Sequence, residues 1–240
     1  MIRIVASPRE QRVWHRLLDL AEVEARWVLI GARMVELHAL EHGRRLGRAS
    51  PDGDALGDAL ARDPNPVRHI AAILLDWGFE VQRASVLGTG HAFVQGDVEI
   101  DVLAPESLGR RSVHARTTVP PLHTVEVPGG RQALDRAETV EIDVGGRQGR
   151  IRRPNLLGAI LIKARAVGVD DVPDSQRQDL ALLLSLVEEP DEIAKQLRGG
   201  ERAWLRRRRE MNDPDLACWL GMTPEHAQRG VSALRILADL

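Results

Sequence analysis

The sequence predicts an α/β (α+β) fold: a mixed sheet with flanking helices in residues 1–150, then an all-helical half in residues 151–240. Residues 27–30 are an apolar run that ends at Gly31 and leads at once into helical spacing, which is typical of a strand, a tight turn and a helix. Several strand-like runs follow in the first half. After Pro154, apolar residues recur only with the helical period. The class therefore follows from the order of these patterns.

Each element of the first half has its own signal. A capping box at Ser7-Pro8-Arg9-Glu10 marks the start of the first helix. Pro, Gly and apolar spacing predict three helices, at about 8–21, 34–43 and 66–78. Runs of β-type residues predict three strands, at about 79–84, 91–95 and 98–103, with a Gly96-Asp97 hairpin turn joining the last two.

The middle and the end of the chain differ in character. Residues 105–150 read as irregular, with many turn residues and a short β-like piece at 139–144. Apolar spacing then predicts helices at about 156–164 and 175–187, and three further helical segments within 190–240. We therefore expect two domains, 1–150 and 151–240.

The composition is that of an ordinary globular chain, 43% hydrophobic and 28% charged. A single cysteine, Cys218, excludes an internal disulfide and any multi-cysteine zinc or iron–sulfur site. The formal net charge is -2, so any contact with nucleic acid has to be local. Because no apolar stretch approaches the ~20 residues of a membrane span and no signal peptide is evident, we expect a soluble, cytoplasmic protein without a membrane partner.

Three aspartates form the strongest chemical signal. Asp52 and Asp54 stand at i and i+2, so on an extended backbone they project from one face. Two such carboxylates repel each other unless a divalent cation lies between them. Asp101 lies in the alternating run 98–103 and would join the pair if the two segments are neighbouring strands. Spacing alone also fits a solvated Asp-Gly-Asp turn.

The order of features over residues 25–190 resembles the nucleotidyltransferase fold of the DNA polymerase β superfamily, in particular the AbiEii-like nucleotidyltransferases found as bacterial toxins. That family has a strand ending in Gly-Gly/Ser, an acid pair in Arg-x-Thr-x-Asp-x-Asp, and a third Asp on a following strand. The matching residues are Gly31, Arg48, Ser50, Asp52, Asp54 and Asp101. A later family pattern is similar to Pro154…Lys163 and Arg177-Gln178-Asp179-Leu180.

The resemblance implies a metal-dependent enzyme that transfers a nucleoside monophosphate from an NTP to a hydroxyl acceptor. Asp52 and Asp54 would bridge two Mg²⁺ (or Mn²⁺) ions, and Asp101 would bind the metal beside the acceptor and take its proton. The remaining matches would bind the nucleotide: Gly31, Ala32, Ser50, Lys163, Asp179 and Arg48. Arg33 is a further candidate for a phosphate contact.

The acceptor that the resemblance favours is an RNA end, for instance of tRNA, with the protein acting as a toxin that an antitoxin protein partners. Two alternatives stay open: a small-molecule nucleotidyltransferase of the aminoglycoside-modifying type, and an inactive member that binds only nucleotide or partner. The sequence specifies neither the nucleotide nor the oligomeric state.

Three residues depart from the family pattern. Ala32 replaces the usual Gly or Ser, which removes a hydroxyl contact to phosphate. Pro51 and Gly53 flank Asp52, and because both are poor strand residues they predict a strand that is short, bulged or at a sheet edge. These departures favour the alternative of an inactive member that binds only nucleotide or partner.

Two motifs point to other classes. His38-Ala39-Leu40-Glu41-His42 matches the H-x-x-E-H signature of inverted zinc peptidases, although two histidines near a helix C-terminus are also favoured by the helix dipole. The segment 216–227 is weakly similar to a DNA-binding helix-turn-helix. The basic run Arg206–Arg209 is either a solvated helix segment or a contact for an RNA backbone.

Overall fold

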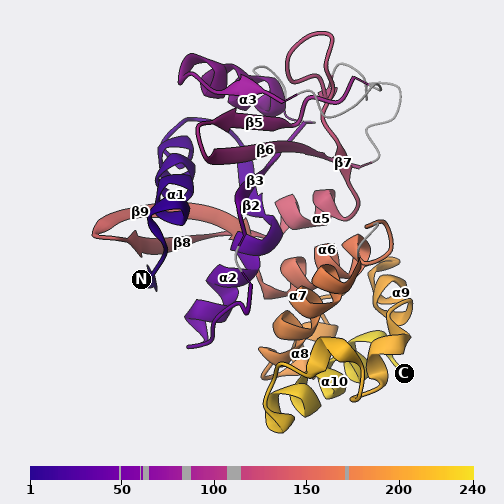
Figure 1. The fold of residues 1–240 in the computed structure, drawn as a ribbon. Coiled ribbons are helices and arrows are strands. Elements are labelled where there is room, and N and C mark those ends of the chain that lie inside the picture. The colour runs from indigo at the N-terminus through magenta and orange to yellow at the C-terminus, as the bar shows by residue number, and fades with distance from the viewer. Residues whose placement is uncertain (49, 60, 62–64, 83–87, 107–114, 171–172) are drawn as a thin grey trace. The chain divides into compact units, whose positions relative to one another are not determined.

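The computed structural model describes the chain except for residues 49, 60, 62–64, 83–87, 107–114 and 171–172. The chain folds into two compact units (Figure 1). The sheet unit consists of residues 1–34 and 49–154, and the helical unit of residues 35–48 and 155–240. The mixed α/β class with a helical C-terminal region is confirmed. Residues 35–48 group with the helical unit. The expected division at residue 150 had assigned them to the first domain.

The sheet unit holds all the strands that the structure describes. These are β1 (Ile2–Ile4), β2 (Trp27–Ile30), β3 (Asp52–Gly57), β4 (Glu80–Val81), β5 (Ala92–Gln95), β6 (Val98–Pro105), β7 (Glu126–Val127), β8 (Ala137–Val144) and β9 (Arg147–Pro154). Its helices are α1 (Pro8–Ala21), α3 (Pro66–Asp76) and α5 (Gly130–Asp135), together with the first turn of α2 (Gly31–Glu41).

The larger sheet has the order β2-β3-β6-β5-β4, with β7 paired to β6. β3 runs antiparallel to β2 and parallel to β6. β5 and β6 form the predicted hairpin around Gly96, and both strands lie where the sequence placed them. The parallel pairing of β3 and β6 sets Asp54 opposite Asp101, and this register determines the geometry of the candidate site.

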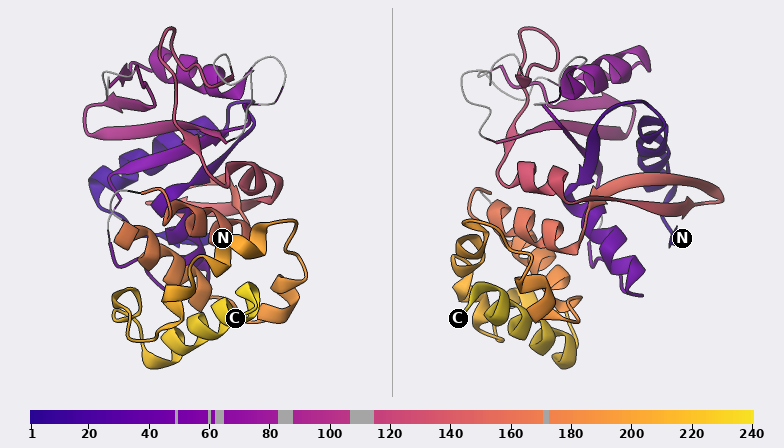
Figure 2. Two further views of the ribbon diagram at one scale, coloured as in Figure 1. Left: turned by 90° about the vertical axis from the view of Figure 1, so that its right-hand side faces the viewer. Right: turned by 180° about the vertical axis from the view of Figure 1, so that it is seen from behind.

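The smaller sheet has the order β1-β8-β9. β8 and β9 pair over their full length as a long antiparallel ribbon, which Figure 2 shows from two further sides. The β-like piece predicted at 139–144 is confirmed as part of β8, whereas the prediction of otherwise irregular structure over 105–150 is wrong for β9. Strand β9, Arg-Gln-Gly-Arg-Ile-Arg-Arg-Pro, carries four arginines and one glycine, and Ile151 is its one residue of high strand propensity. Tertiary packing decides it: α1 packs on β9, and a Cβ on Gly149 would lie 2.7 Å from a methyl group of Leu18.

β3 is a full internal strand of six residues between β2 and β6, so the prediction of a short, bulged or edge strand is wrong. Its glycines lie where helices pack closely on the sheet. A Cβ on Gly53 would meet Leu17 of α1 at 3.0 Å, and one on Gly57 would meet Val67 of α3 at 3.0 Å. Glycine therefore serves close packing here, which outweighs its low strand propensity.

The helices of the sheet unit start as predicted. Ser7 and Glu10 form both halves of a capping box on α1, and the Asn65 side chain accepts a hydrogen bond from the Arg68 amide at the start of α3. α1 buries Val13, Trp14, Leu17 and Leu18. Each fully buried large side chain of this kind contributes about 1.5–3 kcal/mol relative to exposure.

The helical unit contains the rest of α2 and every element after Pro154. These are α6 (Leu156–Ala166), α7 (Pro173–Ser185), α8 (Pro190–Ala194), α9 (Glu201–Arg206), α10 (Pro224–Ala238) and two 3₁₀ turns, η2 (Arg209–Asn212) and η3 (Ala217–Trp219). α7 packs against both α6 and α10. Trp219 is buried beside Gly230 of α10, and its indole N–H donates to the Met211 carbonyl.

Two sequence motifs have structural roles in this unit. The segment proposed as a helix-turn-helix does not form two α-helices, because η3 is a single 3₁₀ turn ahead of α10. In the basic run, Arg206 donates to the Ala238 carbonyl at 2.8 Å and pairs with Asp239, so it satisfies the C-terminus of α10. Of the helices described, none is long and apolar enough to span a membrane.

Candidate active site

Asp52, Asp54 and Asp101 come together in the sheet unit, as predicted. One carboxylate oxygen from each lies within 4.8 Å of the corresponding oxygens of the other two. Asp52 and Asp54 project from β3 and Asp101 from the neighbouring strand β6, where it stands opposite Asp54. Three carboxylates at this spacing form a set of hard oxygen donors of the kind that binds divalent cations.

Gly31 gives Asp54 its place. It follows β2 directly, has φ +69 and begins α2. A Cβ at this position would lie 1.7 Å from Oδ2 of Asp54, so only glycine admits that carboxylate. The carboxylate thus lies at the N-terminus of a helix, where negative charge is favourable. The structure shows this packing role for Gly31, while phosphate contacts by Gly31 and the buried Ala32 stay a prediction.

Asp101 is the unusual member of the three. Its Oδ1 is shielded from solvent and has no hydrogen-bond partner among the described residues. Burial, followed by repulsion from Asp54, Asp52 and Glu99, raises the pKa of Asp101 to about 8. A carboxyl group in this state holds a proton at neutral pH and would release it when a cation arrives.

Two residues position Asp52. The hydroxyl of the buried Ser50 donates to Oδ1 of Asp52 at 2.7 Å, so Ser50 acts on the acid pair in this structure. Arg33 is 1% exposed; it donates to the carbonyl oxygens of Asp52 at 2.7 Å and Ser50 at 2.9 Å and stacks over Trp14. Arg33 therefore fixes the start of β3, and its predicted phosphate contact is wrong. An arginine inside an apolar helix turn was the only sequence signal for this role.

Lys163, Asp179 and Arg48 form a second cluster, entirely within the helical unit. Asp179 is fully buried and accepts from Lys163 at 2.8 Å and from two nitrogens of Arg48, the closer at 2.7 Å. Lys163 also donates to Gln176 at 2.8 Å. Asp179 therefore holds the Lys163 ammonium group in place. Their nucleotide-binding role stays a prediction, because they belong to one unit and the aspartate triad to the other.

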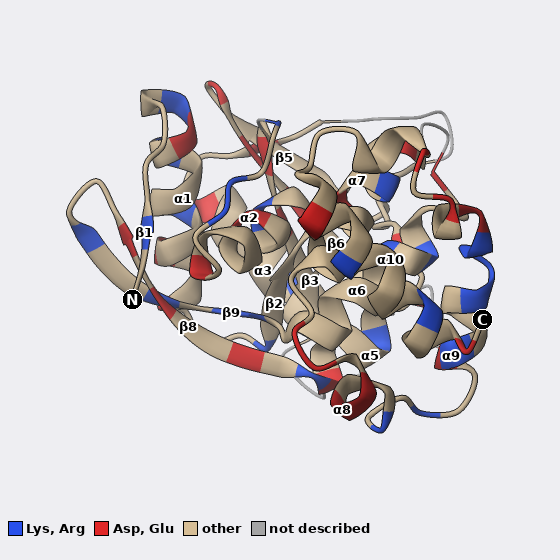
Figure 3. Ribbon diagram, turned by 90° about the horizontal axis from the view of Figure 1, so that it is seen from below, with Lys and Arg blue, Asp and Glu red and all other residues tan. Residues whose placement is uncertain are grey.

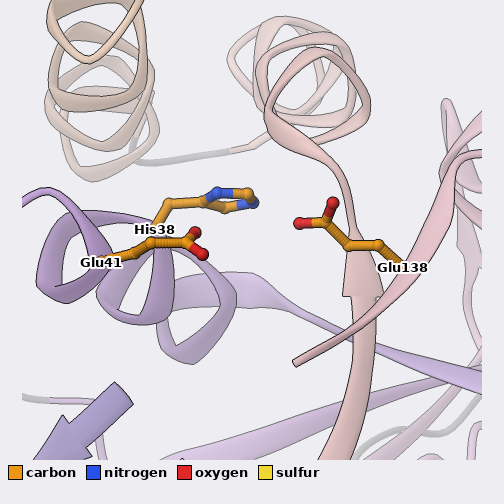
Figure 4. A group of neighbouring side chains, drawn as sticks. All are labelled: His38, Glu41 and Glu138. Atoms are coloured by element: carbon orange, nitrogen blue, oxygen red, sulfur yellow. The ribbon is translucent and has the colours of Figure 1, made fainter. Parts of the chain in front are cut away.

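The H-x-x-E-H motif lies at the end of α2. Figure 4 shows His38 and Glu41 on this helix; Glu138, the third residue drawn, belongs to β8 of the sheet unit. His38 is buried, whereas His42 is exposed and its Nδ1 lies 2.9 Å from the His38 carbonyl oxygen. The His42 ring is therefore occupied at the helix end, which supports the interpretation based on the helix dipole.

Comparisons with known proteins identify no relative. No family model matches the chain, no curated protein is significantly similar to it, and no solved structure matches it at a significant level.

Proposed function

We propose that this protein is a metal-dependent nucleotidyltransferase that transfers a nucleoside monophosphate from an NTP to a hydroxyl acceptor, with an RNA end as the favoured acceptor. The observation that carries the proposal is the convergence of Asp52, Asp54 and Asp101 within 4.8 Å on two parallel strands. The resemblance in sequence order adds the reaction class, and with it the role of a toxin held by an antitoxin protein.

The residues of the triad fit a divalent cation. The donor set is all carboxylate, Gly31 leaves the space that Asp54 occupies, and Oδ1 of Asp101 is a buried acceptor without a partner in the described chain. Mg²⁺ (or Mn²⁺), when bound, would stabilise negative charge on the attacking and leaving oxygens. Asp52 and Asp54 would hold it from β3, and Asp101 from β6.

Asp101 is suited to take the proton of the acceptor hydroxyl. A cation held by the triad would displace the proton that the metal-free protein keeps on Asp101, and the carboxylate could then accept the proton of the hydroxyl. In the proposed step the hydroxyl oxygen bonds to the α-phosphorus, the bond from that phosphorus to the bridging oxygen breaks, and pyrophosphate leaves with the electron pair. The hydroxyl proton passes to a carboxylate oxygen of Asp101.

The geometry favours an active enzyme over the inactive alternative. Pro51 and Gly53 do not displace Asp52, because Arg33 and Ser50 hold the start of β3 and the Asp52 side chain. Gly53 accommodates Leu17 and leaves β3 continuous. Of the three departures from the family pattern, only Ala32 still removes a group that would touch substrate. The small-molecule acceptor of the aminoglycoside type stays the second candidate.

The experiment is a transfer assay with the purified full chain, labelled NTPs and Mg²⁺ or Mn²⁺, offering total RNA and an aminoglycoside as acceptors in separate reactions. Asp52→Ala should reduce transfer at least ~100-fold, because it removes a metal ligand and several kcal/mol of charge stabilisation. The matched control is Glu80→Gln, an exposed acid on β4 of the same sheet, which should transfer normally.

A thermal melt separates catalysis from folding. Asp52→Ala relieves repulsion within the triad but removes the acceptor of the Ser50 hydroxyl, a loss of about 1 kcal/mol, so the two effects nearly cancel. An unfolded Asp52→Ala protein would show that the acid is structural. Wild type that labels no RNA and no small acceptor with either metal would refute the enzyme proposal.

A further inference from the structure

One cavity of the sheet unit lies away from the aspartates. It has a volume of about 310 Å³ and lies between the end of α1, the start of β2 and the β8–β9 ribbon. Its lining contains two cations and no acid: Ala21, Ala25, Trp27, Thr139, Arg150 and Arg152. The indole N–H of the buried Trp27 donates to the Leu20 carbonyl, so the available polar groups are Thr139 and the two arginines.

The two arginines lack partners within the described part of the chain. Arg150 and Arg152 are exposed and stand at i and i+2 of β9, so they share one face of the strand. Glu141 is opposite Arg150 in the ladder, yet no ion pair joins these two described residues. Figure 3 shows acidic residues along β8 and basic residues along β9. Other arginines of this unit, such as Arg147 and Arg12, have a carboxylate partner.

The spacing from the triad limits what can bind both places. Trp27 precedes Ile30 by three residues on β2, and Ile30 is the register partner of Asp54. The cavity therefore lies about 10 Å along the strand from the level of the carboxylates. An acceptor that carries a phosphate on every nucleotide can reach from one to the other.

We infer that Arg150, Arg152 and Thr139 form an anchor for the phosphate backbone of a polynucleotide acceptor, at a distance from the hydroxyl that reacts at the aspartates. The inference rests on the proposed function, which supplies the reason to expect such an acceptor. Two unpaired guanidinium groups attract phosphates and offer them planar, bidentate donors. The same two cations repel an aminoglycoside, which is itself polycationic, so the anchor favours RNA among the two acceptors.

The test is RNA binding without turnover. Fluorescence anisotropy of a labelled RNA strand is measured with the full chain carrying Asp52→Ala, and with the same chain carrying Arg150→Ala and Arg152→Ala in addition. The double change should weaken binding about tenfold and flatten the slope of log K against log salt by about 1.4, the value for two lost contacts to a single strand. The matched control is Arg68→Ala, an exposed arginine on α3, which should change binding less than twofold.

Three outcomes would overturn the anchor. Binding and salt slope unchanged by the double change would show that RNA does not use these arginines. An equal loss with Arg68→Ala would indicate a general charge effect. Displacement of the RNA by inorganic phosphate as effective as by unlabelled RNA would assign the cavity to small anions. A melt checks that each variant remains folded.

Kinetics with the active protein separate this inference from the function it rests on. Arg150→Ala with Arg152→Ala should raise KM for RNA and leave KM for the NTP unchanged, since the cavity lies away from the triad. Loss of RNA binding without any transfer by wild type would refute the proposed function and keep the anchor. Normal transfer by wild type, together with unaltered RNA affinity in the variants, would keep the proposed function and refute the anchor.

Discussion

Each unit holds an aspartate that is shielded from solvent in whole or in part, and the two have opposite surroundings. Asp179 of the helical unit is fully buried between Lys163 and Arg48, with an oxygen within 2.8 Å of each cation. Asp101 of the sheet unit faces two other carboxylates and has an oxygen without a hydrogen-bond partner in the described residues. A compensated charge needs no ligand, whereas a cluster of like charges is favourable only when something positive binds it. The sheet unit is therefore the one in which we expect a bound cation and the chemistry that it supports.

The largest effect expected from this comparison is on Asp179. Asp179→Ala leaves Lys163 and Arg48 without their shared carboxylate, and breaking such a buried pair destabilises a protein by about 3–5 kcal/mol. Urea unfolding measures the loss. The control is Asp174→Ala on the same helix, which removes an exposed ion pair to Arg177 and should change stability by less than about 1 kcal/mol. Equal losses would show that Asp179 is not compensated in the way described.

Asp101→Asn should act in the opposite direction and depend on pH. The folded-state pKa of about 8 is above the ordinary value of 3.8, so the folded protein keeps a proton that the unfolded chain gives up. Wild-type stability should therefore fall as pH rises from about 4 to about 8. Asp101→Asn removes this fall, and we expect the variant to be near neutral at pH 4 and about 3 kcal/mol more stable than wild type at pH 6. A difference independent of pH, in urea melts at both values, would contradict the raised pKa.

Divalent metal should stabilise the sheet unit and leave the ion pairs of the helical unit untouched. Millimolar Mg²⁺ or Mn²⁺ at pH 7 should raise the free energy of unfolding by about 1–3 kcal/mol, the amount expected for a ligand present well above its Kd. Because Asp101 is protonated at that pH, binding should also release close to one proton per chain, which an unbuffered titration records. Asp54→Asn should abolish both signals, and Asp174→Asn should abolish neither.

The smallest effect concerns the support of Asp52. Ser50→Ala removes one buried hydrogen bond to Oδ1 of Asp52 and should reduce stability by about 1 kcal/mol. It should also weaken metal binding severalfold, because the carboxylate is then free to rotate. Isothermal titration with Mn²⁺ measures this. Unchanged affinity would mean that the hydroxyl serves β3 alone.

Local signals in the sequence were sufficient for much of the fold and for placing Asp101 on a strand face, while the convergence of the three acids also needed the pairing of β3 with β6. Capping residues placed α1 and α3, and alternation in 98–103 placed Asp101 on a strand face with other acids. The i, i+2 spacing placed Asp52 and Asp54 on one face of β3. Asp101 joins them because β3 and β6 are neighbouring strands, with Asp54 opposite Asp101 in the register. The capping, alternation and spacing signals depend on residues close together in the chain.

The features that escaped prediction depend on distant contacts. β9 is a strand because α1 packs on it, although its own residues are mainly arginines. Gly53 in β3 is explained by Leu17 of α1, and the role of Arg33 by carbonyl oxygens that lie 17 and 19 positions further along the chain. The pKa of Asp101 follows from its burial and from the other acids that surround it, which no single sequence window contains.

α2 begins in the sheet unit and continues into the helical unit, and this continuity decides how the chain can be divided. The segment that follows it supplies Arg44 to Ser185 and Arg48 to Asp179, both on α7. A gene fragment that starts at Asn155 would encode the later helices without these two arginines and without the buried Val35 and Leu37. The helical unit is therefore discontinuous in sequence, and a fragment that begins at Asn155 does not contain all of it. A shortened protein that carries the helical unit has to include residues 35–48 from the first half of the chain.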